Sequence, residues 1–236
     1  MTEDAKIIFY TVRQCPYAHR VYITLAELGI PYEEKHIDIS VPRSEEYLKI
    51  NPRGKIPSLN YNGKILIESD IIARFLADAH PSHLIPPSAS EAGALRRACV
   101  QFFFDTYINR VQALVYQAID AKTDSEADKI GEKLVENVVK EIEPALSDAS
   151  PYFAGSDKVT LVEALVASHV IRLRSLGRRG IVLSSAVDDL TSRAPNFTKW
   201  GNTLESTPSI IGIFDEGIWI SRIGEKVKAA RLGDGQ

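Results

Sequence analysis

Cys15 is the residue whose type and position most clearly predict chemistry. It follows a short β-forming run at residues 6–11 and begins a stretch with helical spacing, with Pro16 at the first helical position. At a helix start, the helix dipole and unpaired backbone N–H groups favour the reactive thiolate form. His19 and Arg20, one turn later, either add positive charge or lie in solvent. We predict a nucleophilic cysteine rather than a small buried apolar residue.

Cys15 has no second thiol in its own motif. Ala18 stands where a Cys-x-x-Cys motif has its second cysteine, and Cys99 is the only other cysteine of the chain. The apolar helical stretch around Cys99 is typical of a core position. Because the two cysteines have such different contexts, we expect no disulfide framework and a reducing, cytoplasmic environment. A disulfide formed by a lone thiolate must be resolved by an external thiol, and glutathione is the abundant one in that environment.

Two further segments predict a ligand with an amino-acid head and an extended backbone. Pro57 begins a predicted strand, where it cannot donate to the sheet. A cis Ile56–Pro57 bond would turn the backbone of Ile56 outward, free to pair with a ligand. Ser69 and Glu68 lie at a predicted helix start, where N–H groups and a hydroxyl bind a carboxylate and the acid holds an ammonium group. An ordinary capped helix explains Glu68 and Ser69 equally well when they are considered alone.

The first 80 residues predict elements that bring these groups together. In order along the chain they are a strand at 6–11, a helix at 15–28, a strand at 32–39, a helix at 44–50, a hairpin at 58–67 around Asn62-Gly63, and a helix capped by Ser69 with Ile71, Ile72, Phe75 and Leu76 buried. A β-α-β unit followed by a hairpin predicts a mixed four-stranded sheet with helices on its faces.

The rest of the chain predicts a second, all-helical domain. Helical spacing recurs at 91–121, 125–147, 160–177, 195–206 and 216–230. Thr160 and Glu163 have the spacing of a capping box, and Thr207-Pro208 predicts a helix end. We therefore expect an α/β domain at 1–81, a Pro- and Ser-rich linker at 82–92 and a helical domain at 93–236.

Composition excludes several classes of partner. The net charge of −3 gives no basic surface for nucleic acid. The sequence has no run of about 18 apolar residues, so we expect no membrane span. Residues 1–4 carry acidic charge, the wrong sign for a secretory signal.

Three motifs together make the chain resemble the cytosolic glutathione transferases over essentially its whole length. They are Cys15-Pro16-Tyr17-Ala18, Asn51-Pro52-x-Gly54-x-Ile56-Pro57 and Glu68-Ser69. The capping box at Thr160 is also similar to one in that family. The resemblance implies a thioredoxin-like N-terminal domain and an all-helical C-terminal domain. The Cys-Pro-aromatic-Ala motif is similar to the omega-like, cysteine-type group.

The resemblance also implies roles for particular residues. Cys15 would form a mixed disulfide with glutathione, the implied co-substrate, and no metal is expected. The implied glutathione-binding residues are Lys55 and Arg43 at the glycyl carboxylate, Ile56 and Pro57 at the cysteinyl part, and Glu68 and Ser69 at the γ-glutamyl head. The family further implies a homodimer.

Several functions fit this site. The first is glutathione-dependent thiol transfer or reduction, as a thioltransferase, a dehydroascorbate reductase or an enzyme that removes glutathione from small adducts. The second is a transferase of a specialised biosynthetic or detoxification pathway that acts on an aromatic electrophile. Its second-substrate site would include Tyr17, Tyr107, Tyr116 and Trp219, although the last three aromatics equally suit a helical core. The third is a non-catalytic protein that binds ligands through the same fold.

Overall fold

The N-terminal domain is built on a mixed four-stranded sheet with strand order β2-β1-β3-β4. The computed structural model describes residues 5–232, so residues 1–4, with their acidic charge, and residues 233–236 lie outside it. The strands are β1 (Ile7–Thr11), β2 (Glu33–His36), β3 (Ser58–Tyr61) and β4 (Lys64–Ile67). β1 pairs in parallel with β2 and antiparallel with β3, and β3 pairs antiparallel with β4. The predicted mixed sheet is confirmed.

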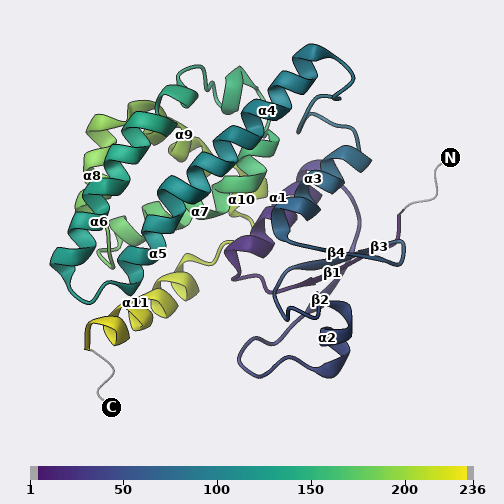
Figure 1. The fold of residues 1–236 in the computed structure, drawn as a ribbon, viewed down its shortest axis with the longest axis horizontal. Coiled ribbons are helices and arrows are strands. Elements are labelled where there is room, and N and C mark those ends of the chain that lie inside the picture. The colour runs from purple at the N-terminus through teal and green to yellow at the C-terminus, as the bar shows by residue number, and fades with distance from the viewer. Residues whose placement is uncertain (1–4, 233–236) are drawn as a thin grey trace.

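Three helices accompany the sheet: α1 (Pro16–Leu28), α2 (Glu45–Ile50) and α3 (Ser69–Ala79). Figure 1 shows α1 and α3 between the sheet and the remaining helices, whereas α2 lies on the other side of the sheet. Phe9 and Leu59 from the sheet are buried in one cluster with Val21 of α1 and Leu76 of α3. This apolar packing fixes α1, and therefore its N-terminal end, against the sheet.

The buried face of α3 differs in detail from the prediction. Ile71, expected in the core, has 52% of its surface exposed, and Ala73 and Ala77 are buried beside Ile72 instead. These two small residues belong to the buried cluster that extends into the helical domain, and periodicity counted over large side chains does not reveal them. The N-cap of α3 also differs from the prediction by one residue. Glu68 is the N-cap, and Ser69 is the first residue of the helix.

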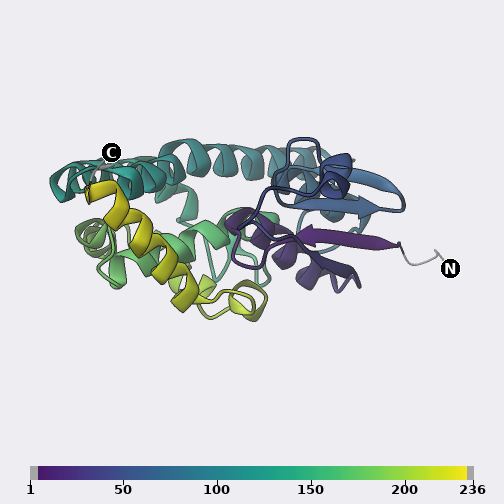
Figure 2. The same cartoon turned by 90° about the horizontal axis from the view of Figure 1, so that it is seen from below.

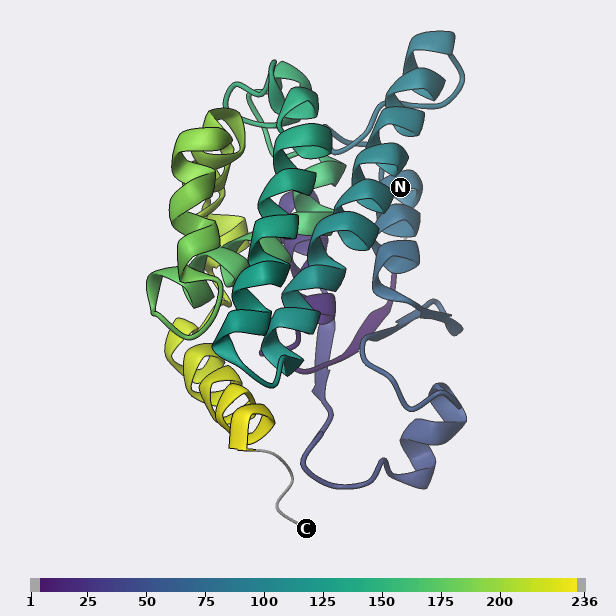
Figure 3. The same cartoon turned by 60° about the vertical axis from the view of Figure 1, so that its left-hand side comes forward.

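The remaining elements are almost all helical. They are α4 (Glu91–Thr106), η1 (Tyr107–Gln112), α5 (Ala113–Asp120), α6 (Asp124–Asn137), η2 (Val138–Ile142), η3 (Pro144–Leu146), η4 (Phe153–Gly155), α7 (Leu161–Arg178), α8 (Ser184–Arg193), α9 (Pro195–Leu204), α10 (Pro208–Ile211) and α11 (Glu216–Leu232). Figure 2 shows the sheet at one end of the molecule and these helices at the other, with α11 leading away from the junction. Figure 3 shows α5 and α6 side by side. Every helix within residues 5–232 is too short or too polar to span a lipid bilayer.

Helix α7 is the centre of the helical domain and also contacts α1. Nearly all of its residues from Leu161 to Gly177 are buried, which is the pattern of a helix surrounded on every side. The predicted capping box at its start is present, with Thr160 as the N-cap and Glu163 three residues later. Glu163 is fully buried and also accepts hydrogen bonds from Phe153 N and Trp200 Nε1, both at 2.8 Å. One carboxylate thus joins η4 and α9 to α7.

Several boundaries of the helical domain differ from the prediction. α4 begins at Glu91, as the helical spacing at 91–121 predicted, so its first two residues lie inside the stretch expected to be linker. α8 was not predicted, because it buries only Ala186 and Leu190 and so has little apolar periodicity. Pro208 starts the short helix α10, which suits a proline at the first helical position.

Cys99 does not occupy the core position that its apolar neighbours predicted. The side chain is exposed on α4, on the same helix as Leu95 and Phe102, which have 65% and 67% of their surface exposed. Spacings of four and three residues place these side chains along one stripe of the helix. α4 therefore presents an apolar stripe that the described part of the chain does not cover.

Candidate active site

Cys15 occupies the N-cap of α1, at the junction that the sequence predicted. Its backbone is extended, with φ −73° and ψ 120°, and Pro16 takes the first helical position. The Cys15 N–H donates to Val12 O at 3.0 Å, and the Cys15 carbonyl accepts from His19 N at 3.0 Å. The half-buried sulfur lies 3.9 Å from the carbonyl oxygen of Ile56. The thiol therefore faces the loop that leads into β3.

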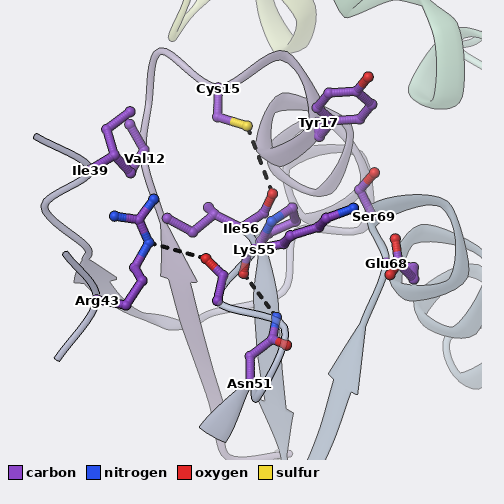
Figure 4. A pocket seen from close by; sticks show the side chains of 12 residues that line it. Val12, Cys15, Tyr17, Ile39, Arg43, Asn51, Lys55, Ile56, Glu68 and Ser69 are labelled. Atoms are coloured by element: carbon purple, nitrogen blue, oxygen red, sulfur yellow. Dashed lines mark hydrogen bonds between the residues drawn. The ribbon is translucent and has the colours of Figure 1, made fainter. Parts of the chain in front are cut away.

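A cleft of about 500 Å³ opens beside this sulfur. Figure 4 shows Cys15 and Tyr17 on one side, Glu68 and Ser69 to the right, and Arg43 to the left. Eight residues that the sequence singled out line this cleft: Cys15, Tyr17, Arg43, Lys55, Ile56, Pro57, Glu68 and Ser69. Val12, Ile39, Asn51 and Gly54 also line it, and of these Asn51 and Gly54 belong to the motif already noted.

Asn51 holds the loop that forms the floor of the cleft. It is almost fully buried, and its amide Nδ2 donates to Lys55 O at 2.8 Å and to Ser58 Oγ at 3.0 Å. Gly54 has φ +62°, a conformation that glycine adopts without steric cost. The Ile56–Pro57 bond is cis, as considered from the sequence. The backbone of Lys55 and Ile56 is therefore held in one conformation at the edge of the cleft.

Glu68 and Ser69 form the right-hand wall of the cleft. Glu68 has φ +67° and ψ 117°, an uncommon conformation for a residue with a side chain, and such residues cluster at functional sites. Its carboxylate pairs with Arg53 Nη1 at 2.6 Å in an exposed position. Ser69 Oγ accepts a hydrogen bond from the buried Arg20 Nη1 at 3.1 Å. A positive guanidinium thus lies behind the first turn of α3, where an anion would bind.

Arg43 bridges the loops on the left of the cleft. Its guanidinium donates to three carbonyl oxygens, those of Asp38, Val41 and Gly54, each at 3.1 Å. These bonds tie the segment after β2 to the loop before β3. Arg43 consequently supports the shape of the cleft in addition to lining it.

Comparisons with known proteins agree with this geometry. Residues 14–79 match the family model of the glutathione S-transferase N-terminal domain. Over 206 residues the chain is 26% identical to glutathione S-transferase omega-1 of Rattus norvegicus, covering 87% of this chain and 79% of that protein. Residues 14–79 thus match a glutathione S-transferase N-terminal domain, and the chain as a whole is similar to omega-class glutathione transferases.

Other known proteins are similar to part or nearly all of this chain. The probable glutathione S-transferase DHAR1, cytosolic, of Oryza sativa is 35% identical over 96 residues, which is 39% of this chain and 45% of that protein. The glutathione transferase Omega 2C of Trametes versicolor shares the fold with a TM-score of 0.80 at 24% identity, covering 95% of this chain and 99% of that one. A rice transferase solved with glutathione has a TM-score of 0.80 at 22% identity, covering 96% and 98% of the two chains.

The aromatic residues considered for a second-substrate site lie in three different environments. Tyr17 is 40% exposed at the edge of the cleft. Tyr116 and Trp219 line a separate narrow cavity where α1, α5, α7 and α11 meet, with Pro16 on its wall. Tyr107 is completely buried in the helical core. The inclusion of Tyr107 in an open site was wrong, because π-helical η1 points this side chain inward.

His19 and Arg20 are buried, which decides between the alternatives left open by the sequence. His19 Nε2 bonds Ile210 O at 2.7 Å, and its Nδ1 accepts from Arg172 Nη1 at 2.9 Å. Burial, with the Arg172 charge in addition, lowers the pKa of His19 to about 3, so the ring is neutral. Arg172 was not predicted to lie near the site, since it is 153 residues away in sequence.

Proposed function

We propose that this chain is a glutathione-dependent thiol transferase or reductase that works through a Cys15–glutathione mixed disulfide. The observation that carries the proposal is the position of the Cys15 sulfur. It lies at a helix N-terminus and faces the same cleft as Ile56, Glu68 and Ser69. The names of relatives that include omega and DHAR transferases support this class of reaction. We expect the protein to act in a compartment that holds reduced glutathione, such as the cytoplasm.

Two thiol–disulfide exchanges complete the proposed cycle. The Cys15 thiolate attacks the glutathionyl sulfur of a glutathione-containing disulfide, and the departing thiolate of the substrate takes up a proton. A second glutathione, as its thiolate, then attacks the glutathionyl sulfur of the mixed disulfide. Oxidised glutathione leaves and the Cys15 thiolate is restored. The net reaction converts the substrate disulfide and one reduced glutathione into the free substrate thiol and one oxidised glutathione.

We propose one orientation for glutathione in the cleft. The start of α3 and the Ser69 hydroxyl would receive the γ-glutamyl carboxylate, supported by Arg20 behind them. The Glu68 carboxylate would bind the ammonium group. The Ile56 backbone would pair with the cysteinyl part next to Cys15, and Lys55 and Arg43 would lie toward the glycyl carboxylate.

The Glu68→Gln variant tests this orientation. Removing the negative charge should raise KM for glutathione about tenfold, because a hydrogen bond between charged groups contributes about 1.5–3 kcal/mol. We expect kcat to change less than twofold, since the reacting sulfurs are not touched. Steady-state kinetics with glutathione as the varied substrate measures both constants. Glu45→Gln, an exposed acid in the first turn of α2, is the matched control and should leave KM unchanged. A Glu68→Gln variant with an unaltered KM would contradict the orientation.

A substrate panel on the wild-type protein tests the proposed reaction class. It compares reduction of β-hydroxyethyl disulfide, reduction of dehydroascorbate and conjugation of a chlorinated aromatic compound. We expect activity in at least one reduction and weak conjugation, because a cysteine forms a disulfide with glutathione instead of activating its thiol by a hydrogen bond. Conjugation that exceeds both reductions would favour the second candidate function. Absence of all three activities, together with no retention on immobilised glutathione, would favour a non-catalytic binding protein.

The second candidate is a transferase that acts on an aromatic electrophile. The observation that favours it is the exposed ring of Tyr17 at the edge of the cleft. An Omega 2S transferase of Trametes versicolor was solved in complex with 2,4-dihydroxybenzophenone. An aromatic compound could stack on Tyr17 within reach of the cysteine-bound glutathione.

The apolar stripe of α4 fits the proposed homodimer. Leu95, Cys99 and Phe102 expose a patch of the kind that marks protein interfaces. We expect light scattering to give twice the mass of one chain for the wild type, and a monomer for Phe102→Glu, because burying an unpaired charge opposes association. Lys133→Glu, an exposed change on α6, is the control and should stay dimeric. A monomeric wild type would contradict the dimer, and a dimeric Phe102→Glu would contradict this interface.

A further inference from the structure

Arg172 on α7 is a buried guanidinium whose hydrogen-bond partners are all neutral. Only 3% of its surface is exposed. Nη1 donates to Ser168 O at 2.8 Å and to His19 Nδ1 at 2.9 Å, and Nε has no partner within the described residues. The guanidinium also stacks on Phe214 and Trp219, at 4.7 Å and 5.4 Å from their ring centres. None of these contacts supplies a negative charge.

The wider cluster around Arg172 contains a second arginine and also lacks a paired carboxylate. Arg20 contacts Ser69 Oγ and His169 Nε2, at 3.1 Å and 2.9 Å. Burial lowers the pKa of His169 well below its usual range, so both histidines of the cluster are neutral. Within residues 5–232, the ion pairs to carboxylates involve neither Arg20 nor Arg172. A buried cation without a counter-ion is costly, so a negative charge nearby would stabilise the cluster.

Two short paths connect Arg172 to the start of α1. Ser168, whose carbonyl accepts from Arg172, donates its hydroxyl to Pro16 O at 2.9 Å. His19, which accepts from Arg172, donates its backbone N–H to Cys15 O at 3.0 Å. The guanidinium also shares the wall of the narrow cavity with Pro16. α7 therefore holds this charge directly behind the residue that follows Cys15.

We propose that Arg172 is a positioning residue, which places a buried positive charge beside the start of α1 and so stabilises the Cys15 thiolate. Burial lowers the pKa of Arg172 to about 10, and the negative charge of Cys15 opposes this shift more than any other charged group does. The interaction is mutual, so the same guanidinium favours ionised sulfur. Arg20 has a different partner, because it faces Ser69 and the charge of Asp70.

Other titratable groups surround this pair and remain uncharged near neutral pH. They come from α1, α2, η1, α5 and α7, and are His19, Tyr47, Tyr107, Tyr116 and His169. Burial raises the pKa of Tyr47, Tyr107 and Tyr116. Arg172 and Arg20 are therefore the buried positive charges near the start of α1, whereas Arg43 and Lys55 line the cleft beside the sulfur.

The pH dependence of Cys15 alkylation tests this role. The rate of reaction with iodoacetamide follows the fraction of thiolate. In Arg172→Met, the midpoint of that profile should move up by about 1 pH unit, a tenfold loss of thiolate at lower pH. Arg172→Lys keeps the charge and should restore most of the wild-type profile. Arg178→Met, an exposed arginine on the same helix, is the control and should not shift it. An unshifted profile in folded Arg172→Met would overturn the proposal.

A second measurement needs no change at Arg172 and therefore does not depend on that variant folding. In a Cys99→Ser background, Cys15 is modified either with iodoacetamide, which leaves a neutral group, or with iodoacetate, which leaves a carboxylate. The neutral form removes the counter-charge, so it should melt about 3 °C below the carboxymethylated form. Equal melting temperatures, or the reverse order, would overturn the proposal.

This inference deepens the proposed function, because it concerns the same thiol, but the two can fail separately. Both tests use alkylating reagents, and their outcome does not require glutathione to bind. If the alkylation results hold and glutathione forms no adduct, only the proposed function fails. If the adduct forms and alkylation is insensitive to Arg172, only the positioning role fails.

Discussion

Replacing Cys15 with serine is expected to lower kcat/KM for glutathione-dependent disulfide reduction by about a thousandfold or more, as when other enzymes lose their nucleophile. A hydroxyl at this position cannot form a disulfide. Cys99 cannot substitute for the missing thiol, because it lies on the exposed stripe of α4 and not in the cleft. The rate of β-hydroxyethyl disulfide reduction at saturating glutathione measures the loss.

Two controls make this result specific to the thiol. Cys15→Ser should still bind immobilised glutathione, because Glu68, Ser69 and the Asn51-braced loop are unchanged. Cys99→Ser should retain full reductase activity. If Cys15→Ser kept more than a tenth of the wild-type rate, a covalent step at Cys15 could not be part of the main reaction.

Replacing Glu163 with alanine is expected to lower the free energy of unfolding by about 4 kcal/mol, since truncating a buried, hydrogen-bonded charge strands its donors. The N–H groups of Phe153, Thr160 and Trp200 each donate to this carboxylate at 2.8 Å. Alanine removes the acceptor for all three and leaves a cavity at the start of α7. Urea unfolding followed by circular dichroism measures the change.

Glu126 provides the matched comparison for Glu163. It also follows a threonine N-cap, and it accepts from Lys122 N at 2.8 Å, but in an exposed position at the start of α6. Water can replace that bond, so Glu126→Ala should cost about 1 kcal/mol or less, as for other helix caps. If the two alanine variants lowered the free energy of unfolding equally, the burial of Glu163 would add nothing to the stability of the fold.

The elements that carry the cleft could be predicted because their signals are local. A β-forming run followed by Cys15-Pro16 marks a strand-to-helix junction, and Asn62-Gly63 between two short strands marks a hairpin. The motif from Asn51 to Pro57 is one short segment of the chain, so its residues lie close together in space whatever the rest of the fold. These short-range patterns were enough to predict the mixed sheet and to single out Cys15, Ile56, Pro57, Glu68 and Ser69. Arg43 and Lys55 were implied by the resemblance to glutathione transferases.

Features that depend on contacts between distant segments could not be predicted in this way. Helical spacing in α1 does not say that His19 and Arg20 face α7, whose Arg172 and His169 lie about 150 positions away. The exposure of Cys99 follows from the absence of a packing partner within the described chain, and an apolar stretch looks the same whether a core or another protein covers it.

Mass spectrometry of the intact protein after incubation with oxidised glutathione tests the proposed Cys15–glutathione disulfide most directly. The Cys99→Ser variant is used, so that Cys15 is the only thiol. We expect the mass to rise by one glutathionyl group, peptide mapping to place it on Cys15, and excess reduced glutathione to remove it. A protein that gains no such mass, although its Cys15 still reacts with iodoacetamide, would contradict the proposed mechanism.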